Sequence, residues 1–437
     1  MMKQVLQRLF LETLEELSLE RVMRASVGRR GDALVAGDAE ADVVAAERIL
    51  VAGIGKAALP MCQALVPLLP AGKAEVAIVA PEVPQGLPDG FRAFAGGHPY
   101  PNEGSMLSAR HMLERAAALD RGDLLLCLLS GGGSAICEAP LDPAVSLADL
   151  RQFFAVLVTC GANIVDMNIL RKHVSLLKGG RLAQAASPAR QLTLYVSDVP
   201  PDKPSSVASG PTMPDESTCQ DAYETAGRLG IVERLPAPIR KRFESRTLEE
   251  TPKPGAGVFS ESQWVCLLDN SDALERLESK ARGLGWILER DLSVDDEPVE
   301  LAAGTLLDRL QALAGSHPGK TVAVTTGGEL SSPVKGDGMG GRNQAFVLWA
   351  ARKLAERGMR ATVLSAGTDG IDGNSPATGS VADESTVLRA GAQGLDPEDF
   401  ERRSDSYRFF RQLGDLIVTG PTGNNVRDLR ILVAGPQ

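Results

Sequence analysis

The sequence has 437 residues, too many for a single hydrophobic core, and this length predicts two domains. With 43% hydrophobic and 23% charged residues, 45 glycines and 27 prolines, the composition is globular and excludes a disordered or fibrous chain. The 46 basic and 56 acidic residues give a net charge of −10, which repels phosphate backbones and anionic lipid headgroups. We therefore expect no nucleic-acid or membrane partner. A small anionic ligand is compatible with this net charge, because basic residues in a cleft can attract it locally.

The N-terminal segment predicts an amphipathic helix rather than a signal peptide. Leu6, Phe10, Leu14 and Leu17 recur at helical spacing, and several glutamates interrupt them. No run of about 18 apolar residues follows that could span a membrane. The six cysteines show no CxxC pair and no dense spacing, so we expect reduced thiols in a cytoplasmic protein rather than disulfides or a zinc knuckle; they are Cys62, Cys127, Cys137, Cys160, Cys219 and Cys266.

Short apolar runs that end in Gly, Ser, Thr or Asp alternate with helical patterns, as in parallel βα units. They predict strands at 48–55, 75–80, 123–131 and 191–198, and then at 263–270, 285–290, 321–328, 361–370, 416–420 and 430–435. A charged stretch with prolines and glycines at 240–258 predicts the domain boundary, which gives domains of 1–250 and 251–437, each with its own sheet.

Ligands of open α/β sheets bind beyond the carboxyl ends of the strands, so the residues that follow each run are the site candidates. After the first run, Gly53 and Gly55 let a ligand approach the backbone, and Lys56 adds a cation near a helix N-terminus. The alternative is a tight turn with a solvated lysine.

The segment after the very apolar run at 123–131 reads Ser130, Gly131, Gly132, Gly133, Ser134. Consecutive glycines free the backbone amides to surround an anion, and the two hydroxyls add donors. Further along, 163–181 predicts one amphipathic helix that carries Arg171, Lys172 and Lys178, one of which could reach a phosphate. In the same segment, His173 is interpreted as a hydrogen-bonded structural histidine.

Asp198 ends the run at 191–198, where a carboxylate can accept a proton from a substrate hydroxyl or hold a divalent cation. Prolines 200, 201 and 204 disfavour a helix N-cap, which is the structural alternative. In the second half, Arg342 follows a glycine-rich loop and stands in the first turn of a predicted helix, where its charge opposes the helix dipole. An anionic ligand would neutralise both, so we predict a phosphate or carboxylate clamp.

The loop 365–376 carries Asp369 and Asp372 among glycines, which is typical of Mg²⁺ coordination, hydroxyl recognition or simple Asp-Gly turns. Two nucleotide-binding motifs occur in the sequence without the structural context that each of them needs. Gly336, Gly338 and Gly341 fit GxGxxG but follow only a short apolar stretch, and PGKT at 318–321 lacks the earlier glycine of a Walker A loop and precedes its strand.

Together these segments resemble the type II glycerate 2-kinase family, whose C-terminal half is the MOFRL domain. The resemblance rests on LLSGGGSA, NILRKHVSLLKGGRLA, SDVP with SGPT, GDGMGGRNQ and GTDGIDGNSPA, and it covers nearly the whole chain. It implies two Rossmann-like three-layer α/β/α lobes, an active site in the cleft between them, and ATP- and Mg²⁺-dependent phosphorylation of D-glycerate at its 2-hydroxyl. Asn102 and Asn424 depart from the family, which usually carries aspartate and threonine there.

By this resemblance the catalytic residues are Lys56, Asp198, Arg342 and Asp369, with Asp198 also a metal ligand. Predicted substrate- or nucleotide-binding residues are Gly53, Gly55, Ser130, Gly131, Gly132, Gly133, Ser134, Glu329 and Asn343. An NAD(P)H-dependent hydroxypyruvate reductase is the first alternative function, and a non-catalytic sensor of sugar acids or nucleotides is the second. The sequence leaves open which glycine loop takes phosphate and which takes carboxylate, the range of hydroxy acids, and whether the protein is a homo-oligomer.

Overall fold

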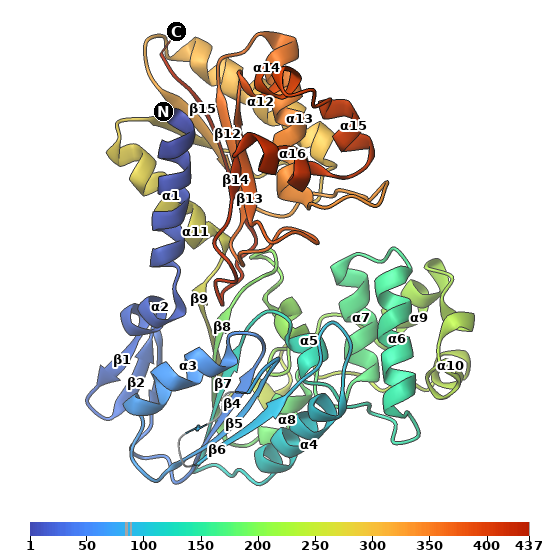
Figure 1. Ribbon diagram of the computed structural model, residues 1–437. Helices are drawn as coiled ribbons and strands as arrows, with labels where there is room; N and C mark the ends of the chain where they lie inside the picture. The colour runs from blue at the N-terminus through green and yellow to red at the C-terminus, as the bar shows by residue number, and fades with distance from the viewer. Residues whose placement is uncertain (84–85, 88–89, 437) are drawn as a thin grey trace. The chain divides into compact units, whose positions relative to one another are not determined.

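The computed structural model describes residues 1–83, 86–87 and 90–436, and these divide into two compact units. The N-terminal unit is Leu19–Leu267, and the C-terminal unit combines Leu268–Gln437 with Met1–Ser18. Both are built on a six-stranded sheet (Figure 1). None of the helices among the described residues is long and apolar enough to cross a lipid bilayer.

The sheet of the N-terminal unit has the order β6-β5-β4-β7-β8-β9, with parallel pairing from β6 through β8. Its strands are β4 (Ile49–Ile54), β5 (Ala74–Ala80), β6 (Phe91–Ala95), β7 (Leu124–Leu129), β8 (Arg190–Val196) and β9 (Ser262–Leu268). A small antiparallel sheet is formed by β1 (Val27–Arg30), β2 (Ala33–Ala36) and β3 (Ala39–Asp42).

Helices cover both faces of this sheet, because β4 and β7 are buried along their whole length and turn apolar side chains to each side. On one face α3 packs against β4, and on the other α4, α5 and α8 share a core with Leu50, Leu125 and Leu129. The helices are α2 (Leu19–Ser26), α3 (Ala58–Leu65), α4 (Glu103–Ala117), α5 (Gly133–Ile136), α6 (Leu147–Thr159), α7 (Ile164–Val174), α8 (Arg181–Ala186), α9 (Cys219–Arg228) and α10 (Ala237–Glu244).

The helices α6, α7, α9 and α10 form a separate bundle with its own apolar core, which includes Phe153, Phe154 and Ile231. The helix predicted over 163–181 is interrupted here: α7 ends at Val174, and α8 begins only at Arg181. Gly179 and Gly180 both have positive φ in the intervening turn, so the segment makes a bend where one helix was expected.

The C-terminal unit has the sheet order β10-β11-β15-β12-β13-β14. Only β10 and β11 pair in parallel; β15 runs antiparallel to both of its neighbours, and β13 is antiparallel to β12 and β14. Its strands are β10 (Ile287–Arg290), β11 (Val322–Thr326), β12 (Thr362–Gly367), β13 (Gly379–Asp383), β14 (Leu416–Ile417) and β15 (Asp428–Ala434). The repeated parallel theme predicted for this half is therefore confirmed for β10 and β11 alone.

Two layers of helices flank this mixed sheet, α12 and α13 on one face and α1 and α11 on the other (Figure 1). The helices are α1 (Met2–Glu16), α11 (Asn270–Gly283), α12 (Val299–Ser316), α13 (Arg342–Arg357), α14 (Thr386–Ala392), α15 (Pro397–Arg402) and α16 (Ser406–Leu413). Short 3₁₀ turns in the chain are Val66–Leu68, Pro204–Ser209, Val232–Arg234 and Gly257–Phe259. The predicted α/β class with two sheets is confirmed.

The division of the chain differs from the predicted 1–250 and 251–437 in two ways. First, the stretch rich in proline and glycine belongs to the N-terminal unit, where buried Thr251 donates to Asp215 at 2.9 Å and Phe259 packs on Trp264. Its composition marks turns on the surface of that unit, and the strand expected at 263–270 to open the second sheet is the edge strand β9 of the first.

Second, the predicted N-terminal amphipathic helix forms, but it packs on the C-terminal sheet. Leu6 and Phe10 of α1 are fully buried, and Lys3 pairs with Asp415 at 2.8 Å. Asn424, one of the two departures from the family pattern, donates from Nδ2 to the carbonyl oxygen of Leu17 at 2.7 Å. The other departure, Asn102, caps α4 by accepting from the backbone N–H of Ser105 at 2.9 Å.

Candidate active site

In the N-terminal unit, Lys56, the glycine turn after β7 and Asp198 lie at adjacent strand ends. Parallel pairing aligns Ile54 of β4 with Leu129 of β7, and Leu129 with Tyr195 of β8, so the residues that follow these strands emerge at one edge of the sheet. The sequence analysis selected these residues because each follows a predicted strand, and the pairing places those strand ends side by side.

Backbone contacts fix the first turn against the second. The N–H of Lys56 donates to the carbonyl oxygen of Gly131 at 3.0 Å, and the N–H of Ala57 donates to Oγ of buried Ser130 at 2.9 Å. Gly55 has a φ of +119°, and a Cβ there would lie 2.5 Å from Ser130. Only glycine fits this position, because both the backbone conformation and the space exclude a side chain.

The glycines of the second turn are needed for close approach to the two charged residues. A Cβ on Gly131 would lie 2.3 Å from Oδ2 of Asp198, and a Cβ on Gly132 would lie 3.2 Å from Cε of Lys56. The carboxylate of Asp198 and the chain of Lys56 therefore flank the same turn. Ser134 closes it with a 2.8 Å hydrogen bond to Ser209, and Gly133 packs on Ala208.

His98 lies within the electrostatic influence of both Lys56 and Arg171. The pKa of His98 is lowered by partial burial and by the positive charges of Lys56 and Arg171. Arg171 stacks on Phe154 at 4.9 Å and is 9% exposed. Burial lowers its pKa to about 10, against a partial opposing effect of Glu138. No carboxylate of the described residues lies within ion-pair distance of Arg171.

The other cations of the predicted 163–181 helix have internal partners. Lys172 pairs with Asp215 at 3.1 Å, and Lys178, which is fully buried, forms an ion pair with Glu138. Of Arg171, Lys172 and Lys178, Arg171 is thus the cation without a carboxylate partner among the described residues. His98 was not predicted as a site residue because it follows β6, a strand that the sequence patterns did not reveal.

In the C-terminal unit, Arg342 begins α13 and contacts two carboxylates. Its Nε donates to Asp428 at 2.6 Å, and Nη2 lies 2.9 Å from Glu329. Burial favours a lower pKa for this guanidinium, but Asp428, Glu329 and Asp372 outweigh it and the net pKa is raised. From the sequence we expected an anionic ligand to neutralise the positive charge at this helix N-terminus. In the structure, protein carboxylates pair with that charge.

Asp428 and Arg430 of β15 are the components of this cluster that the sequence reasoning missed. Arg430 is fully buried, donates to Asp428 at 2.8 Å, and also donates to the carbonyl oxygens of Gly327 and Gly328. The signal was present as two charges inside the otherwise apolar run DLRILVA. Buried charges persist in a sheet only when they are paired, and such pairs concentrate near functional sites.

Asp372 and Asn343 hold the start of α13. The carboxylate of Asp372 accepts from the backbone N–H groups of Asn343 at 3.1 Å and Gln344 at 2.9 Å. Complete burial raises its pKa to about 6, although these hydrogen bonds work against the shift. The side chain of Asn343 is 1% exposed and is bonded to Asp372 and Ser365, so in this structure it orients neighbouring groups rather than facing solvent.

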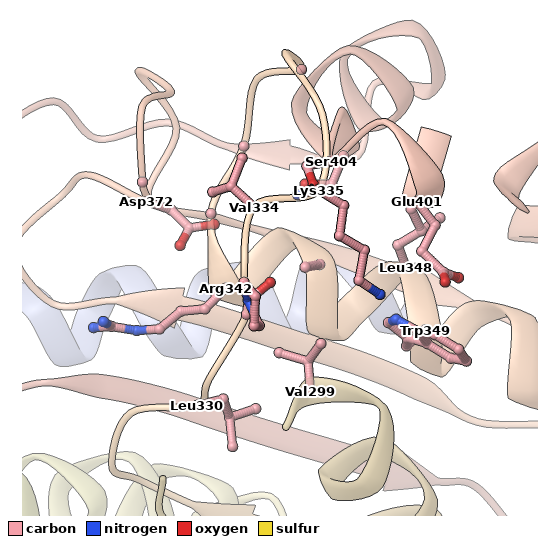
Figure 2. Close-up of a pocket in the computed structure, with 18 of the residues that line it drawn as sticks. Val299, Leu330, Val334, Lys335, Arg342, Leu348, Trp349, Asp372, Glu401 and Ser404 are labelled. Carbon is pink, nitrogen blue, oxygen red and sulfur yellow. Dashed lines mark hydrogen bonds between the residues drawn. The ribbon is translucent and has the colours of Figure 1, made fainter. Parts of the chain in front are cut away.

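Arg342, Asp369 and Asp372 line a pocket of about 780 Å³ within the C-terminal unit. Figure 2 shows Val299 and Leu330 along one side and Lys335 extending toward Trp349, whereas the guanidinium of Arg342 points away from Trp349. Asp369 is half-buried after β12, and its carboxylate accepts from the N–H of Ile371 at 3.1 Å. The pocket therefore joins an apolar and aromatic part to a charged part.

Comparison with known proteins shows the family of the chain. Residues 5–244 match a domain of unknown function, DUF4147, and residues 322–428 match the MOFRL family. A D-glycerate 2-kinase of Thermotoga maritima is 35% identical over 88% of this chain and 90% of its own length. The chain belongs to the glycerate 2-kinase family. A glycerate 2-kinase of Pyrococcus horikoshii is 30% identical over 88% of this chain and 87% of its own.

The solved structures similar to this family member include a glycerate kinase from Thermotoga maritima, with a TM-score of 0.79, 30% identity and 99% of both chains covered. A relative of Agrobacterium vitis that carries the name of a hydroxypyruvate reductase is 34% identical over 89% of this chain and 87% of its own. Names of both activities therefore occur among the relatives of this glycerate 2-kinase family member.

Proposed function

We propose that the protein transfers the γ-phosphoryl group of ATP to the 2-hydroxyl of D-glycerate, with Mg²⁺, to give 2-phosphoglycerate and ADP. The observation that carries the proposal is the convergence of Lys56, the glycine turn and Asp198 at three adjacent strand ends. Family membership supports the same reaction. The buried free thiols of Cys62, Cys127 and Cys137 are in keeping with a cytoplasmic enzyme.

The reaction asks the protein for in-line positioning and for charge neutralisation. The 2-hydroxyl oxygen attacks the γ-phosphorus, the bond to the bridging oxygen breaks, and the electron pair leaves with ADP. Asp198 accepts the hydroxyl proton, for which its half-buried carboxylate beside Gly131 is suited. Lys56 balances the charge that spreads over the transferred oxygens, and Arg342 does so if a phosphoryl oxygen replaces Glu329 as its partner.

Carboxylate oxygens are the ligands that Mg²⁺ prefers, so Asp198 would hold such an ion in this proposal, and Asp369 is a separate candidate. Bound to phosphate oxygens, Mg²⁺ would neutralise charge that Lys56 and Arg342 do not reach. The backbone N–H groups of Gly131, Gly132 and Gly133 could bind an anionic group of either substrate.

Arg171 provides a further cation for substrate binding in this proposal. Its charge acts on His98, as that of Lys56 does; it is stacked on Phe154, and it lacks a carboxylate partner among the residues described. An anionic group of glycerate or of the nucleotide would compensate it. Because a planar guanidinium matches a carboxylate or phosphate with two parallel donors, a lysine could not replace it fully.

The glycines of the GxGxxG string at 336–341 are explained by packing and need no bound dinucleotide. The string lies in an irregular loop, and a Cβ on Gly336 or Gly338 would lie within 2.7 Å of the carbonyl oxygen of Arg403. A Cβ on Gly341 would meet Asp372 at 2.3 Å. These glycines serve packing between loops, and a dinucleotide fingerprint needs a strand directly before it. This favours the kinase over the reductase.

Phosphorus NMR of the protein incubated with ATP, Mg²⁺ and D-glycerate tests the proposal, since it identifies the product and the position of the phosphate. Lys56→Ala and Arg342→Ala should each lower kcat by ~10²- to 10³-fold, the usual cost of removing one charge-stabilising group. A lower kcat in both variants would support the proposal that residues of both units contribute to one reaction. That the active site lies in a cleft stays a prediction. Oxidation of NADH by hydroxypyruvate without ADP release would instead establish the reductase.

A further inference from the structure

A second cluster of potential ligand atoms lies in the N-terminal unit, outside the residues assigned to the reaction. It consists of His173 at the end of α7, Cys219 at the first position of α9, and Glu250 in the segment after α10. One ligand atom from each, the imidazole nitrogen, the thiol sulfur and a carboxylate oxygen, lies within 4.8 Å of the other two. The three positions are far apart in sequence, so no metal motif predicts them.

The histidine is oriented as a ligand. Its Nδ1 lies 2.8 Å from the carbonyl oxygen of Ile169, and because a carbonyl can only accept, Nδ1 carries the proton. The lone pair is therefore on Nε2. The His173 ring is 1% exposed, and Nε2 has no hydrogen-bond partner within residues 1–83, 86–87 and 90–436. Buried ring nitrogens without a partner are uncommon, whereas metal-binding histidines typically donate their other nitrogen to a backbone carbonyl.

The other two groups are open to solvent, which gives an ion a way in. Cys219 is partly exposed and Glu250 is exposed. One oxygen of Glu250 accepts from the backbone N–H of Cys219 at 2.5 Å, which holds the carboxylate beside the thiol. Its other oxygen pairs with Lys253 at 2.6 Å. Lys253 also donates to Thr251 and to the carbonyl oxygen of Ser217, so it keeps partners if Glu250 turns to a cation.

We propose that His173 Nε2, Cys219 Sγ and a carboxylate oxygen of Glu250 bind one divalent cation of borderline softness, Zn²⁺ above all, with water completing the coordination. Imidazole, thiolate and carboxylate are the usual protein ligands of Zn²⁺, whereas Mg²⁺ prefers oxygen alone. Binding converts the thiol of Cys219 to a thiolate, and its proton passes to solvent. The ion would join α7, α9 and the segment after α10, and would thereby cross-link the helical bundle.

Cobalt(II) is the probe for the test, because it takes zinc sites and reports a thiolate ligand by a charge-transfer band in the near ultraviolet. The full-length protein, stripped with a chelator, should bind one Co²⁺ with this band. Zn²⁺ should displace the cobalt and raise the Tm, and a large excess of Mg²⁺ should do neither. Cys219→Ser should abolish the band, and Glu250→Gln should weaken Zn²⁺ binding by at least about tenfold, the scale found even for residues that only support ligands.

Cys160→Ser is the matched control, since Cys160 is also a partly exposed free thiol and lies outside the cluster. This variant should keep the band and the Zn²⁺ affinity of the wild type. His173 is buried and its replacement could unfold the bundle, so the two solvent-accessible ligands carry the test. Absence of the band at saturating Co²⁺, or an unchanged band in Cys219→Ser, would overturn the proposal.

Discussion

Adding one methyl group at Gly131 should lower the catalytic rate and leave the stability of the fold nearly unchanged. The Cβ of Gly131→Ala would lie 2.3 Å from Oδ2 and 2.9 Å from Cγ of Asp198, whereas ordinary contacts begin near 3.4 Å. The carboxylate must therefore move by about 1 Å, and a displacement of that size in a reacting group costs ~10²-fold in rate. Gly131 does not have a positive φ, so alanine fits its backbone.

The fold should tolerate this change, because alanine fits the backbone conformation of Gly131 and Asp198 is only half-buried. We expect kcat for ADP release with D-glycerate to fall by ~10²-fold, with a Tm close to that of the wild type. Gly28→Ala is the control, since a methyl group added at Gly28 would have no atom within 4 Å and the residue has no positive φ. A Gly131→Ala enzyme with near-normal kcat would refute the role given to Asp198.

Three further predictions concern buried charges. Lys178→Met should lower the free energy of unfolding by ~3–5 kcal/mol in urea denaturation, because Glu138 is left buried without its partner. The Lys178→Met, Glu138→Leu double variant should recover most of this loss, and a double variant that loses the sum of the two single losses would contradict the prediction. Arg171→Lys should raise KM for one substrate about tenfold with little change in Tm, and unchanged steady-state kinetics would remove it from the site. The Asp372 carboxyl, whose pKa burial raises to about 6, lowers the stability of the folded state as pH rises from about 4 to about 6, by up to ~3 kcal/mol. Asp372→Asn cannot titrate, so its deficit relative to wild type should shrink over that range in unfolding measurements, and a constant deficit would mean that Asp372 does not titrate there.

Strand ends were the part of the site that sequence could predict. Residues such as Gly55, Lys56 and Asp198 follow apolar runs that fold into β4 and β8, and parallel pairing brings their ends to one edge. The cluster around Arg342 was predictable only in part. Its partner Asp428 comes from the start of β15, which runs antiparallel to its neighbours, and strand direction depends on connections that periodicity does not encode.

The division between the units was misplaced for a related reason. Prolines and glycines at 240–258 mark turns, but they do not tell whether those turns lie between domains or on the surface of one. Contacts distant in sequence decide this, such as the hydrogen bond from Thr251 to Asp215. Likewise, the amphipathic pattern of α1 predicted a helix and its buried face, but it could not identify the sheet that the face would cover.

The placement of α1 means that the polypeptide passes between the units twice, near residue 18 and near residue 267. A gene fragment that begins at 268 would therefore encode an incomplete module, with the surface normally occupied by Leu6 and Phe10 open to water. Supplying residues 1–18 as a separate peptide should restore its solubility. An affinity tag fused at the first residue would thus be attached to the C-terminal unit rather than to the N-terminal one.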